Sequence, residues 1–422
     1  MPHFLITDVN TSYNKGDAAI IIGLLKTLRK FYPTSEISIL TPTPVEDNKY
    51  YSEYGAKTYI QLYNYIDRKI PKIAYKLLFL LKLALYLTWI KLSFIPISQN
   101  DKNVLHLYQR ADLIISCSAG RLGGRKYLSI YDSLIPIYFA KKLGKKIYIC
   151  SQSIEPFTSN ILKVLTRFVL NRVNLITVRE PISFKLLKSI NIKKPVYLTA
   201  DLAFLADSEP TESGYKLLKD CNVPRNNKLR VGITVVNWTF PNTKKSKTKQ
   251  REYINAITSS IETLIEEMNA IVIFFPHAIS IKEDDRKLSQ QIKAEIKKSL
   301  TSNVFVLTEN YSPQQTKSMI GTLDMFIATR LHSGVFALSM NIPTLVIGFE
   351  QKSWGFMEMF GLQDYVLDIN TITAEQIVSS FNKLLKVRNE VIQRIKEKLP
   401  TVKNKAEQNG ELIEKLLNEN DT

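Results

Sequence analysis

Short apolar runs alternate with longer segments of helical periodicity along the chain. Residues 4–9, FLITDV, have a buried-strand pattern and lead through a polar loop into residues 18–32, where apolar positions recur at helical spacing. A second apolar run at 37–40 completes a strand–loop–helix–strand unit, which is typical of a parallel sheet. The N-terminal run is short, has no cationic region before it and contains Asp8, so we expect the first strand of a fold and not a secretory signal.

The same alternation continues in two series. Strand-like runs of the first series lie at 111–120, 145–153, 174–180 and 195–204, with helical patterns at 159–170 and 182–190. Strand-like runs of the second series lie at 229–236, 270–277, 304–309, 324–330 and 343–349, with helices near 252–268, near 285–299 and after 374. We therefore expect an α/β protein with two Rossmann-like βαβ domains facing a cleft. The expected units are 1–205, a linker at 206–228, 229–385 and C-terminal helices at 386–422.

Composition and charge limit the partners. The chain has 422 residues, 45% of them apolar, and a formal net charge of +18. A basic chain has acidic default partners, namely nucleic acid, an anionic membrane or a charged small molecule. No nucleic-acid-binding signature accompanies the basic residues, so we expect no nucleic-acid partner. Cys117, Cys150 and Cys221 lack C-x-x-C spacing, which excludes a disulfide framework and a cysteine-only zinc site and suits the reducing cytoplasm.

One segment, residues 69–92, reads KIPKIAYKLLFLLKLALYLTWIKL and combines an apolar stripe with five lysines and no acidic residue. Its longest uncharged run, 83–90, is far shorter than the ~20 residues that a spanning helix needs. A lysine-edged apolar helix favours the interface of an anionic bilayer, so we predict a peripheral location at the inner face of the plasma membrane. The alternative is a buried helix with its lysines at the rim.

Candidate chemistry gathers where strand-like runs end. Arg179 and Lys352 each follow such a run and are suited to hold a carboxylate or phosphate in the cleft. Arg330 and His332 are two residues apart, so we expect them to share one face of an extended segment ahead of a helix. His332 is the side chain best suited to proton transfer near neutral pH. A purely structural pair with Glu180 is the alternative for Arg179.

Two glycine-containing loops complete the set. Loop 11–17, TSYNKGD, precedes a helix whose free N–H groups suit an anion or a sugar hydroxyl, and Asp17 is expected to cap that helix or to act as a base. Loop 118–125, SAGRLGGR, has three glycines that allow the backbone to approach a ligand closely. The sequence contains no H-E-x-x-H, P-loop or G-x-G-x-x-G motif. The pattern favours an anionic small substrate, acid–base chemistry and no metal.

These motifs follow an order that resembles the polysaccharide pyruvyl transferase family. The matching blocks are N-x-G-D at 14–17, a Gly-rich block after 111–117, Q-S-I-x-P-F at 152–157, R-E-x-x-S at 179–183, T-A-D-x-A-F at 199–204, R-L-H at 330–332 and a segment at 342–357. Two residues depart from the family pattern. Glu155 stands where the family often has Gly, and Arg121 interrupts the glycine block.

The resemblance implies a GT-B-like fold and transfer of pyruvate from phosphoenolpyruvate onto a sugar of a cell-surface polysaccharide or its lipid-linked precursor, as a cyclic ketal. It implies no cofactor beyond this donor substrate, with the acceptor on the N-terminal domain and the donor on the C-terminal domain. The implied catalytic residues are His332, Arg330, Lys352 and Arg179. The implied substrate-binding residues are Asn14, Gly16, Asp17, Gly120, Arg121, Gly123, Gly124, Gln152 and Glu350.

Several alternatives stay open at this point. Asp17 and His332 are both candidates for the base. A GT-B glycosyltransferase that uses a nucleotide sugar, with Glu350 on the ribose, is a second function. A non-catalytic, membrane-associated scaffold of glycan assembly is a third. The sugar, the ketal stereochemistry and the number of subunits do not follow from the sequence.

Overall fold

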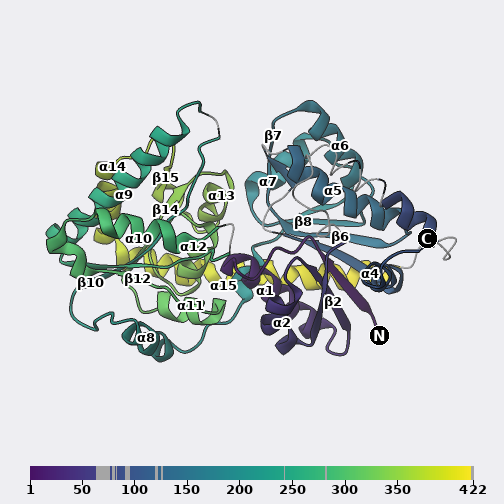
Figure 1. The fold of residues 1–422 in the computed structure, drawn as a ribbon, viewed down its shortest axis with the longest axis horizontal. Coiled ribbons are helices and arrows are strands. Elements are labelled where there is room, and N and C mark those ends of the chain that lie inside the picture. Colours follow the sequence, from purple (N-terminus) through teal and green to yellow (C-terminus); the bar gives the residue numbers. More distant parts are fainter. Residues whose placement is uncertain are drawn as a thin grey trace.

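Two parallel β-sheets, one after the other in the sequence, organise the chain into two lobes (Figure 1). The computed structural model describes residues 1–62, 77, 81, 83–90, 96–118, 122–124, 127–241, 243–280 and 283–419. The first sheet has the order β3-β2-β1-β4-β6-β8-β9 and the second has the order β12-β11-β10-β13-β14-β15. In each sheet the order reverses beside the first strand, as in doubly wound folds. The expected α/β architecture with two Rossmann-like domains is confirmed.

The strands are short and all pair in parallel. The first sheet contains β1 (His3–Thr7), β2 (Glu36–Thr41), β3 (Ala56–Ile60), β4 (Leu113–Cys117), β6 (Lys146–Gln152), β8 (Leu175–Val178) and β9 (Val196–Leu198). The second contains β10 (Leu229–Thr234), β11 (Ala270–Phe274), β12 (Val304–Val306), β13 (Met325–Ala328), β14 (Thr344–Gly348) and β15 (Val366–Asp368). A small separate sheet pairs β5 (Leu122–Gly124) with β7 (Ile154–Phe157).

Helices connect and cover these strands. The first lobe has α1 (Lys15–Phe31), α2 (Pro44–Tyr51), α4 (Gln99–Arg110), α5 (Tyr127–Lys142), α6 (Asn160–Leu170), α7 (Pro181–Ser189) and the 3-10 turns η1 (Ser52–Tyr54) and η2 (Leu202–Leu205). The second lobe has α8 (Thr211–Asp220), α9 (Ser246–Met268), α10 (Asp285–Glu295), η3 (Lys298–Asn303), α11 (Pro313–Ile320), α12 (Leu331–Ser339), α13 (Lys352–Glu358), η4 (Gln363–Tyr365) and α14 (Ala374–Lys386). Helix α15 (Arg388–Asn418) is the last helix of the described part of the chain.

Helix α1 follows β1 after a short loop and is capped by Asn14. The Oδ1 atom of Asn14 accepts hydrogen bonds from the backbone N–H groups of Gly16 at 3.0 Å and Asp17 at 3.3 Å. The helix therefore begins at Lys15, three residues before the apolar periodicity starts. Asp17 lies inside the first turn, and the expectation that it caps the helix is wrong.

Different helices pack on the two faces of the first sheet. Phe4 and Leu5 belong to separate apolar clusters because successive side chains of β1 point to opposite faces. The cluster of Phe4 includes residues of α1, η2 and α15, and the cluster of Leu5 includes residues of α4, α5, α6 and 83–90. In Figure 1, α5 and α6 lie on one side of β6 and β8, and α1 and α15 lie on the other.

Helix α15 returns from the second lobe to the first and contacts elements of both (Figure 1). Its Asn409 is fully buried, and its Oδ1 accepts hydrogen bonds from Tyr148 at 2.5 Å and Thr177 at 2.8 Å. A Cβ at the next residue, Gly410, would lie 2.4 Å from the ring of Phe31, so glycine permits the close approach. These contacts attach the C-terminal helix to the first lobe.

Two segments singled out from the sequence are 206–228 and 69–92. Residues 206–228, expected as a linker, contain α8, which packs against α11 so closely that a Cβ at Gly214 would lie 2.4 Å from a backbone oxygen of Ser318. Most of residues 69–92, including the five lysines, lies outside the described residues. A search of the described part of the chain finds no helix with the length and apolarity to cross a membrane.

Candidate active site

Arg179 stands at the carboxyl end of β8 and is 3% exposed. Its Nη1 donates to Asp201 Oδ2 at 2.7 Å, and its Nε donates to Ser153 Oγ at 2.7 Å. The same Nη1 lies 3.2 Å from Nε2 of His332, a residue of the second lobe. A buried cation, a carboxylate and an imidazole therefore meet where the two lobes touch.

Asp201 connects the members of this cluster. Its Oδ2 lies 3.4 Å from Nε2 of His332, and its Oδ1 accepts from the backbone N–H of Ala203 at 2.9 Å. Burial alone would raise the pKa of Asp201, but Arg179 and His332 hold it well below its ordinary value, so the carboxylate stays ionised. Reasoning from the residues missed Asp201, although the T-A-D-x-A-F block was a signal that it follows a strand.

A pocket opens beside the cluster and is lined by both lobes. Its polar lining is Arg179, Glu180, Asp201 and Lys352, and its apolar lining is Phe204, Leu331, Phe356 and Met359. The structure thus brings Arg179 and Lys352 together on one pocket. His332 is not part of this lining and lies behind Arg179 and Asp201.

Gly16 lets the ring of His332 lie against the first turn of α1. A Cβ at Gly16 would be 2.2 Å from Nδ1 and 2.4 Å from Cβ of His332, which no real Cβ contact tolerates. Asp17 follows in the same turn and is 7% exposed. The N-x-G-D block therefore places the N-terminal turn of α1, with its positive dipole end, beside the histidine.

Arg330 belongs to a different cluster. It is the N-cap residue of α12, and His332 lies in the first turn of that helix, so the prediction that both share one face of an extended segment is wrong. Arg330 Nη2 donates to Asp285 Oδ1 at 2.5 Å and to Glu283 Oε1 at 2.7 Å. Burial would lower the pKa of Arg330, but these carboxylates raise it above its ordinary value. Asp285 also accepts from the backbone N–H of His277 at 3.0 Å, so Arg330 braces the segment behind His332.

Two buried bases lie on the far side of His332. The ring of His277 stacks on it, with centroids 6.5 Å apart and planes at 12°, and neither ring nitrogen of His277 has a partner among the described residues. Burial lowers the pKa of His277 well below its ordinary value. Lys15 Nζ donates to Asn310 Oδ1 at 2.5 Å, and burial lowers its pKa to about 7. No sequence motif used above signalled His277, and Lys15 occupies the unspecified position of the N-x-G-D block.

Carboxylates surround the pocket's lysine. Lys352 begins α13 and forms an ion pair with Glu350 at 2.5 Å. Burial raises the pKa of Glu155 to about 7, although Lys352 opposes the shift. Glu180 caps α7 by accepting from the backbone N–H of Ser183 at 2.9 Å. A Cβ at Gly355 of α13 would lie 2.8 Å from Glu180, so glycine lets α13 approach α7.

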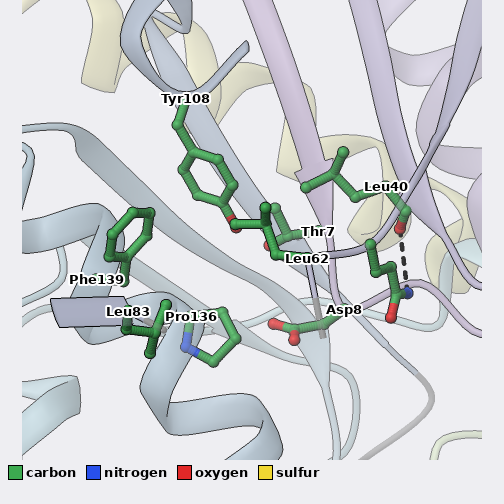
Figure 2. A pocket seen from close by; sticks show the side chains of 9 residues that line it. Thr7, Asp8, Leu40, Leu62, Leu83, Tyr108, Pro136 and Phe139 are labelled. Atoms are coloured by element: carbon green, nitrogen blue, oxygen red, sulfur yellow. Dashed lines mark hydrogen bonds between the residues drawn. The ribbon is translucent and has the colours of Figure 1, made fainter. Parts of the chain in front are cut away.

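A second pocket lies near the point where the strand order of the first sheet reverses, between β1 and β4 (Figure 2). Asp8 follows β1 with a φ of 62°, is 2% exposed and accepts from Ser116 Oγ at 2.5 Å. Gln152 donates to the same Ser116 Oγ at 3.0 Å, and its Oε1 has no partner in the described part of the chain. These polar groups form a row along the carboxyl edge of the sheet, where such sheets bind ligands.

The walls of this second pocket are mostly apolar. They consist of Thr7, Asp8, Leu40, Gln61, Leu62, Leu83, Tyr108, Pro136 and Phe139. Figure 2 shows the carboxylate of Asp8 pointing toward Pro136. Gln152 is linked to this edge of the sheet by the hydrogen bond that it donates to Ser116. The next residue, Ser153, accepts a hydrogen bond from Arg179 of the first pocket. The two pockets are therefore joined by consecutive residues of the chain.

The Gly-rich block is described in part. Gly123 and Gly124 lie in β5, where Gly123 pairs with Glu155 of β7. Gly120 and Arg121 lie outside the described residues. Over the ranges that are described, no group of three or more His, Cys, Asp and Glu side chains is arranged to hold a metal ion.

Solved structures with this arrangement are known at low sequence identity. The UDP-GlcNAc 2-epimerase from Neisseria meningitidis has a TM-score of 0.59 at 13% identity with both chains covered fully. A putative UDP-N-acetylglucosamine 2-epimerase from Listeria monocytogenes has a TM-score of 0.62 at 12% identity, covering 100% of this chain and 97% of that one. A glycosyltransferase from Rickettsia africae has a TM-score of 0.55 at 10% identity and 99% coverage of both chains. These matches show the fold, which is similar to that of GT-B glycosyltransferases and of the 2-epimerases.

Sequence comparison is more specific. The amylovoran biosynthesis protein AmsJ of Erwinia amylovora is 24% identical over 407 residues, covering 93% of this chain and 94% of that protein. A family model described as polysaccharide pyruvyl transferase matches residues 14–350, a span that begins at the cap of α1 and includes Arg179, Asp201 and His332. The chain therefore belongs to the polysaccharide pyruvyl transferase family.

Proposed function

We propose that the protein transfers pyruvate from phosphoenolpyruvate to two hydroxyl groups of one sugar, forming a cyclic ketal on a cell-surface polysaccharide or its lipid-linked precursor. The observation that carries the proposal is the pocket between the lobes, which is lined by Arg179 and Lys352 and backed by His332. The name of the amylovoran relative supports a polysaccharide as the acceptor class.

Phosphoenolpyruvate carries a carboxylate and a phosphate, so its site needs cations at fixed positions. Arg179 is held by Asp201 and Ser153 and provides a fixed planar donor group, and Lys352 provides a more mobile point charge. We assign both to the donor. Arg330, which is engaged by Asp285 and Glu283, is assigned a positioning role behind His332.

The reaction needs two proton movements. One sugar hydroxyl attacks C2 of the donor while C3 gains a proton, and the second hydroxyl attacks C2 as the bond from C2 to the phosphate oxygen breaks. Of the two hydroxyl protons, one balances the new methyl group and the other leaves with phosphate. We assign this proton transfer to His332, whose Nε2 is oriented by Asp201 and Arg179. Asp17, in the turn beside it, remains the second candidate for the base.

The acceptor is assigned to the first lobe. Asn14, Gly16 and Asp17 present the first turn of α1 to the shared site, and Gln152 links that site to the second pocket. We place the protein in the cytoplasm, peripheral at the inner face of the plasma membrane. The acid-free, lysine-rich segment 69–92 supports this location, and a lipid-linked acceptor would be presented there.

The decisive assay is phosphate release from phosphoenolpyruvate by purified protein, with and without saccharide acceptors. Release is expected only with a suitable acceptor. His332→Ala and Lys352→Ala should each lower the rate by about 100-fold or more while the protein stays folded. Lys216→Ala, an exposed lysine of α8, is the matched control and should keep the wild-type rate. Full activity in both site variants would overturn the assignment.

The nucleotide-sugar alternative is tested in parallel. Thermal unfolding is measured with phosphoenolpyruvate and with uridine diphosphate. A rise in Tm with phosphoenolpyruvate that Lys352→Ala abolishes supports the proposal. A saturable rise with the nucleotide and none with phosphoenolpyruvate would replace the proposal with a glycosyltransferase that uses a nucleotide sugar.

A further inference from the structure

Exposed apolar side chains are concentrated on two helical segments of the first lobe. Eight large hydrophobic residues of the described part are exposed, and six of these lie on α6 and on the segment 77–90. The six are Leu77, Leu81, Leu85, Ile161, Val164 and Phe168. Single exposed apolar residues need no explanation, but two stripes of three residues indicate a surface with a partner.

Helix α6 is apolar on both of its long faces. Leu162, Val169 and Leu170 are buried against the lobe. Ile161 and Val164, spaced by three, and Phe168, one turn further, form a stripe on the outside, with Ile161 63% exposed. Packing within the chain explains the buried face of α6 and part of Phe168, whose ring contacts Tyr138 and the guanidinium of Arg172 at 3.5 Å. It leaves Ile161 and Val164 more than 60% exposed.

The segment 77–90 repeats this arrangement. Leu83, Tyr86 and Trp89, spaced by three, are buried in the lobe. Leu77, Leu81 and Leu85, spaced by four, are exposed, two of them by 60% or more. The described residues of this segment therefore include a buried face and three exposed apolar side chains.

Both segments that carry the stripes border α5. Leu83, on the buried face of its segment, lies in the pocket with Pro136 and Phe139 of α5, and the ring of Phe168 on α6 lies 6.0 Å from that of Tyr138 on α5, tilted by 42°. This side of the first sheet is opposite to α1 and α15 (Figure 1). The surface thus lies away from the helix that joins the two lobes.

The charge on and beside α6 has one sign. Lys163, Arg167 and Arg172 are exposed on or just after α6, and residues 156–179 contain no acidic residue. In the sequence, residues 68–100 contain six basic residues and no acidic one, and these six lie outside the described residues. Basic side chains beside an outward apolar stripe match an anionic lipid surface, which takes apolar groups below its headgroups and attracts cations.

We propose that the α5–α6 face, defined by the six exposed apolar residues together with Lys163, Arg167 and Arg172, docks on an anionic lipid bilayer. Helix α6 is a second membrane contact besides the lysine-rich segment. This face would be the membrane contact of a protein with the peripheral location proposed above. The proposal rests on that location and does not depend on the pyruvyl-transfer chemistry.

Flotation with lipid vesicles tests the proposal. Wild-type protein should float with vesicles of phosphatidylglycerol and phosphatidylcholine and much less with phosphatidylcholine alone. The triple variant Ile161→Ser, Val164→Ser, Phe168→Ser should partition about tenfold more weakly or worse. Val45→Ser, at an exposed apolar residue of α2, is the matched apolar control and should float like wild type.

Charge reversal on α6 tests the electrostatic contribution to vesicle binding. Lys163→Glu with Arg167→Glu should weaken binding to the anionic vesicles about tenfold or more. Lys216→Glu with Lys219→Glu on α8 makes the same charge change at exposed sites of the second lobe and should have little effect. Circular dichroism and Tm verify that every variant is folded.

Three results would overturn the proposal. Wild-type protein could fail to float with either vesicle, or the triple variant could float as well as wild type. Alternatively, the wild-type protein could fail to bind lipid and form a dimer in light scattering, and the triple substitution could dissociate that dimer. The surface would then bind a second copy of the chain. Phosphate release with a water-soluble saccharide should be unchanged in the triple variant, so failure of docking and failure of the proposed reaction are distinguishable.

Discussion

Replacing Gly16 with Ala tests whether the contact between α1 and His332 matters for function. The new Cβ would start 2.2 Å from Nδ1 and 2.4 Å from Cβ of His332. Because the overlap includes the root of the histidine side chain, rotation of the ring does not relieve it. Restoring a separation of 3.0 Å moves the histidine or the helix by at least 0.8 Å.

Two effects on stability oppose each other in this variant. Alanine is favoured over glycine inside a helix by about 1 kcal/mol. Overpacking in a tight interior costs typically about 1–3 kcal/mol. The free energy of unfolding should therefore fall by no more than about 2 kcal/mol. A displacement near 1 Å at a reacting group is enough to lower the rate about 100-fold.

Acceptor-dependent phosphate release and urea denaturation together give the answer. Gly16→Ala should reduce kcat/KM about 100-fold in a folded protein. Gly321→Ala is the matched control, since its Cβ meets the flexible end of Met340 at 2.6 Å and that side chain moves away easily. Wild-type kcat/KM in Gly16→Ala, together with normal stability, would refute the reasoning that α1 positions His332.

The remaining predictions concern the charged groups around the pocket. Asp201→Asn leaves the buried Arg179 without its anion, so the free energy of unfolding in urea should fall by about 3 kcal/mol and activity should be lost; unchanged stability would contradict the role given to this pair. Arg330→Gln leaves Asp285 unpaired and should lower the melting temperature and kcat, with little change in the KM for phosphoenolpyruvate because Arg330 does not line the pocket; a large rise in that KM would instead indicate direct donor binding. Burial raises the pKa of Glu155 from 4.5 to about 7, so the folded state holds this proton more tightly than the unfolded state does. Glu155→Gln should therefore become more stable relative to wild type by up to about 3 kcal/mol as pH rises from about 5 to about 8, measured by urea denaturation; parallel curves over this range would exclude the shift.

Local pattern predicted the frame of the fold. Apolar runs such as 229–236 and 270–277 lie close to β10 and β11, because a buried parallel strand needs a short continuous apolar run. Arg179 follows the carboxyl end of a strand in the first sheet and Lys352 follows the carboxyl end of a strand in the second, and these two edges meet at the pocket. The order of elements, which periodicity provides, predicts that each residue lies beyond the end of its strand.

The pattern of apolar and polar residues did not predict how the two lobes pack against each other. The R-L-H block contains no feature that says whether Arg330 ends a strand or caps a helix, and the difference sends the two side chains into separate clusters. The importance of Asp201 depends on a contact with a histidine of the other lobe. The sequence places Gly16 in a loop before a helix but gives no sign that the absence of its side chain leaves space for His332. Each of these facts is a relation between distant parts of the chain.

The two cations of the pocket differ in how firmly they are paired, which bears on how the proposed site would select its anionic donor. Arg179 and Lys352 both already contact a carboxylate, so the pocket offers no surplus of bare positive charge. The Arg179–Asp201 pair is buried, and breaking such a pair costs about 3–5 kcal/mol, so it stays intact and fixes one end of the donor. The Lys352–Glu350 pair is more exposed, with side chains 15% and 29% exposed, so solvent screens it more and Lys352 exchanges its partner at a lower cost than Arg179 does. For the donor proposed above, we expect one anionic group to meet the fixed arginine while the other replaces Glu350 on the mobile lysine, and we expect a ligand with one weak charge to gain too little to displace Glu350. One immobile and one exchangeable ion pair would therefore favour the proposed doubly anionic donor.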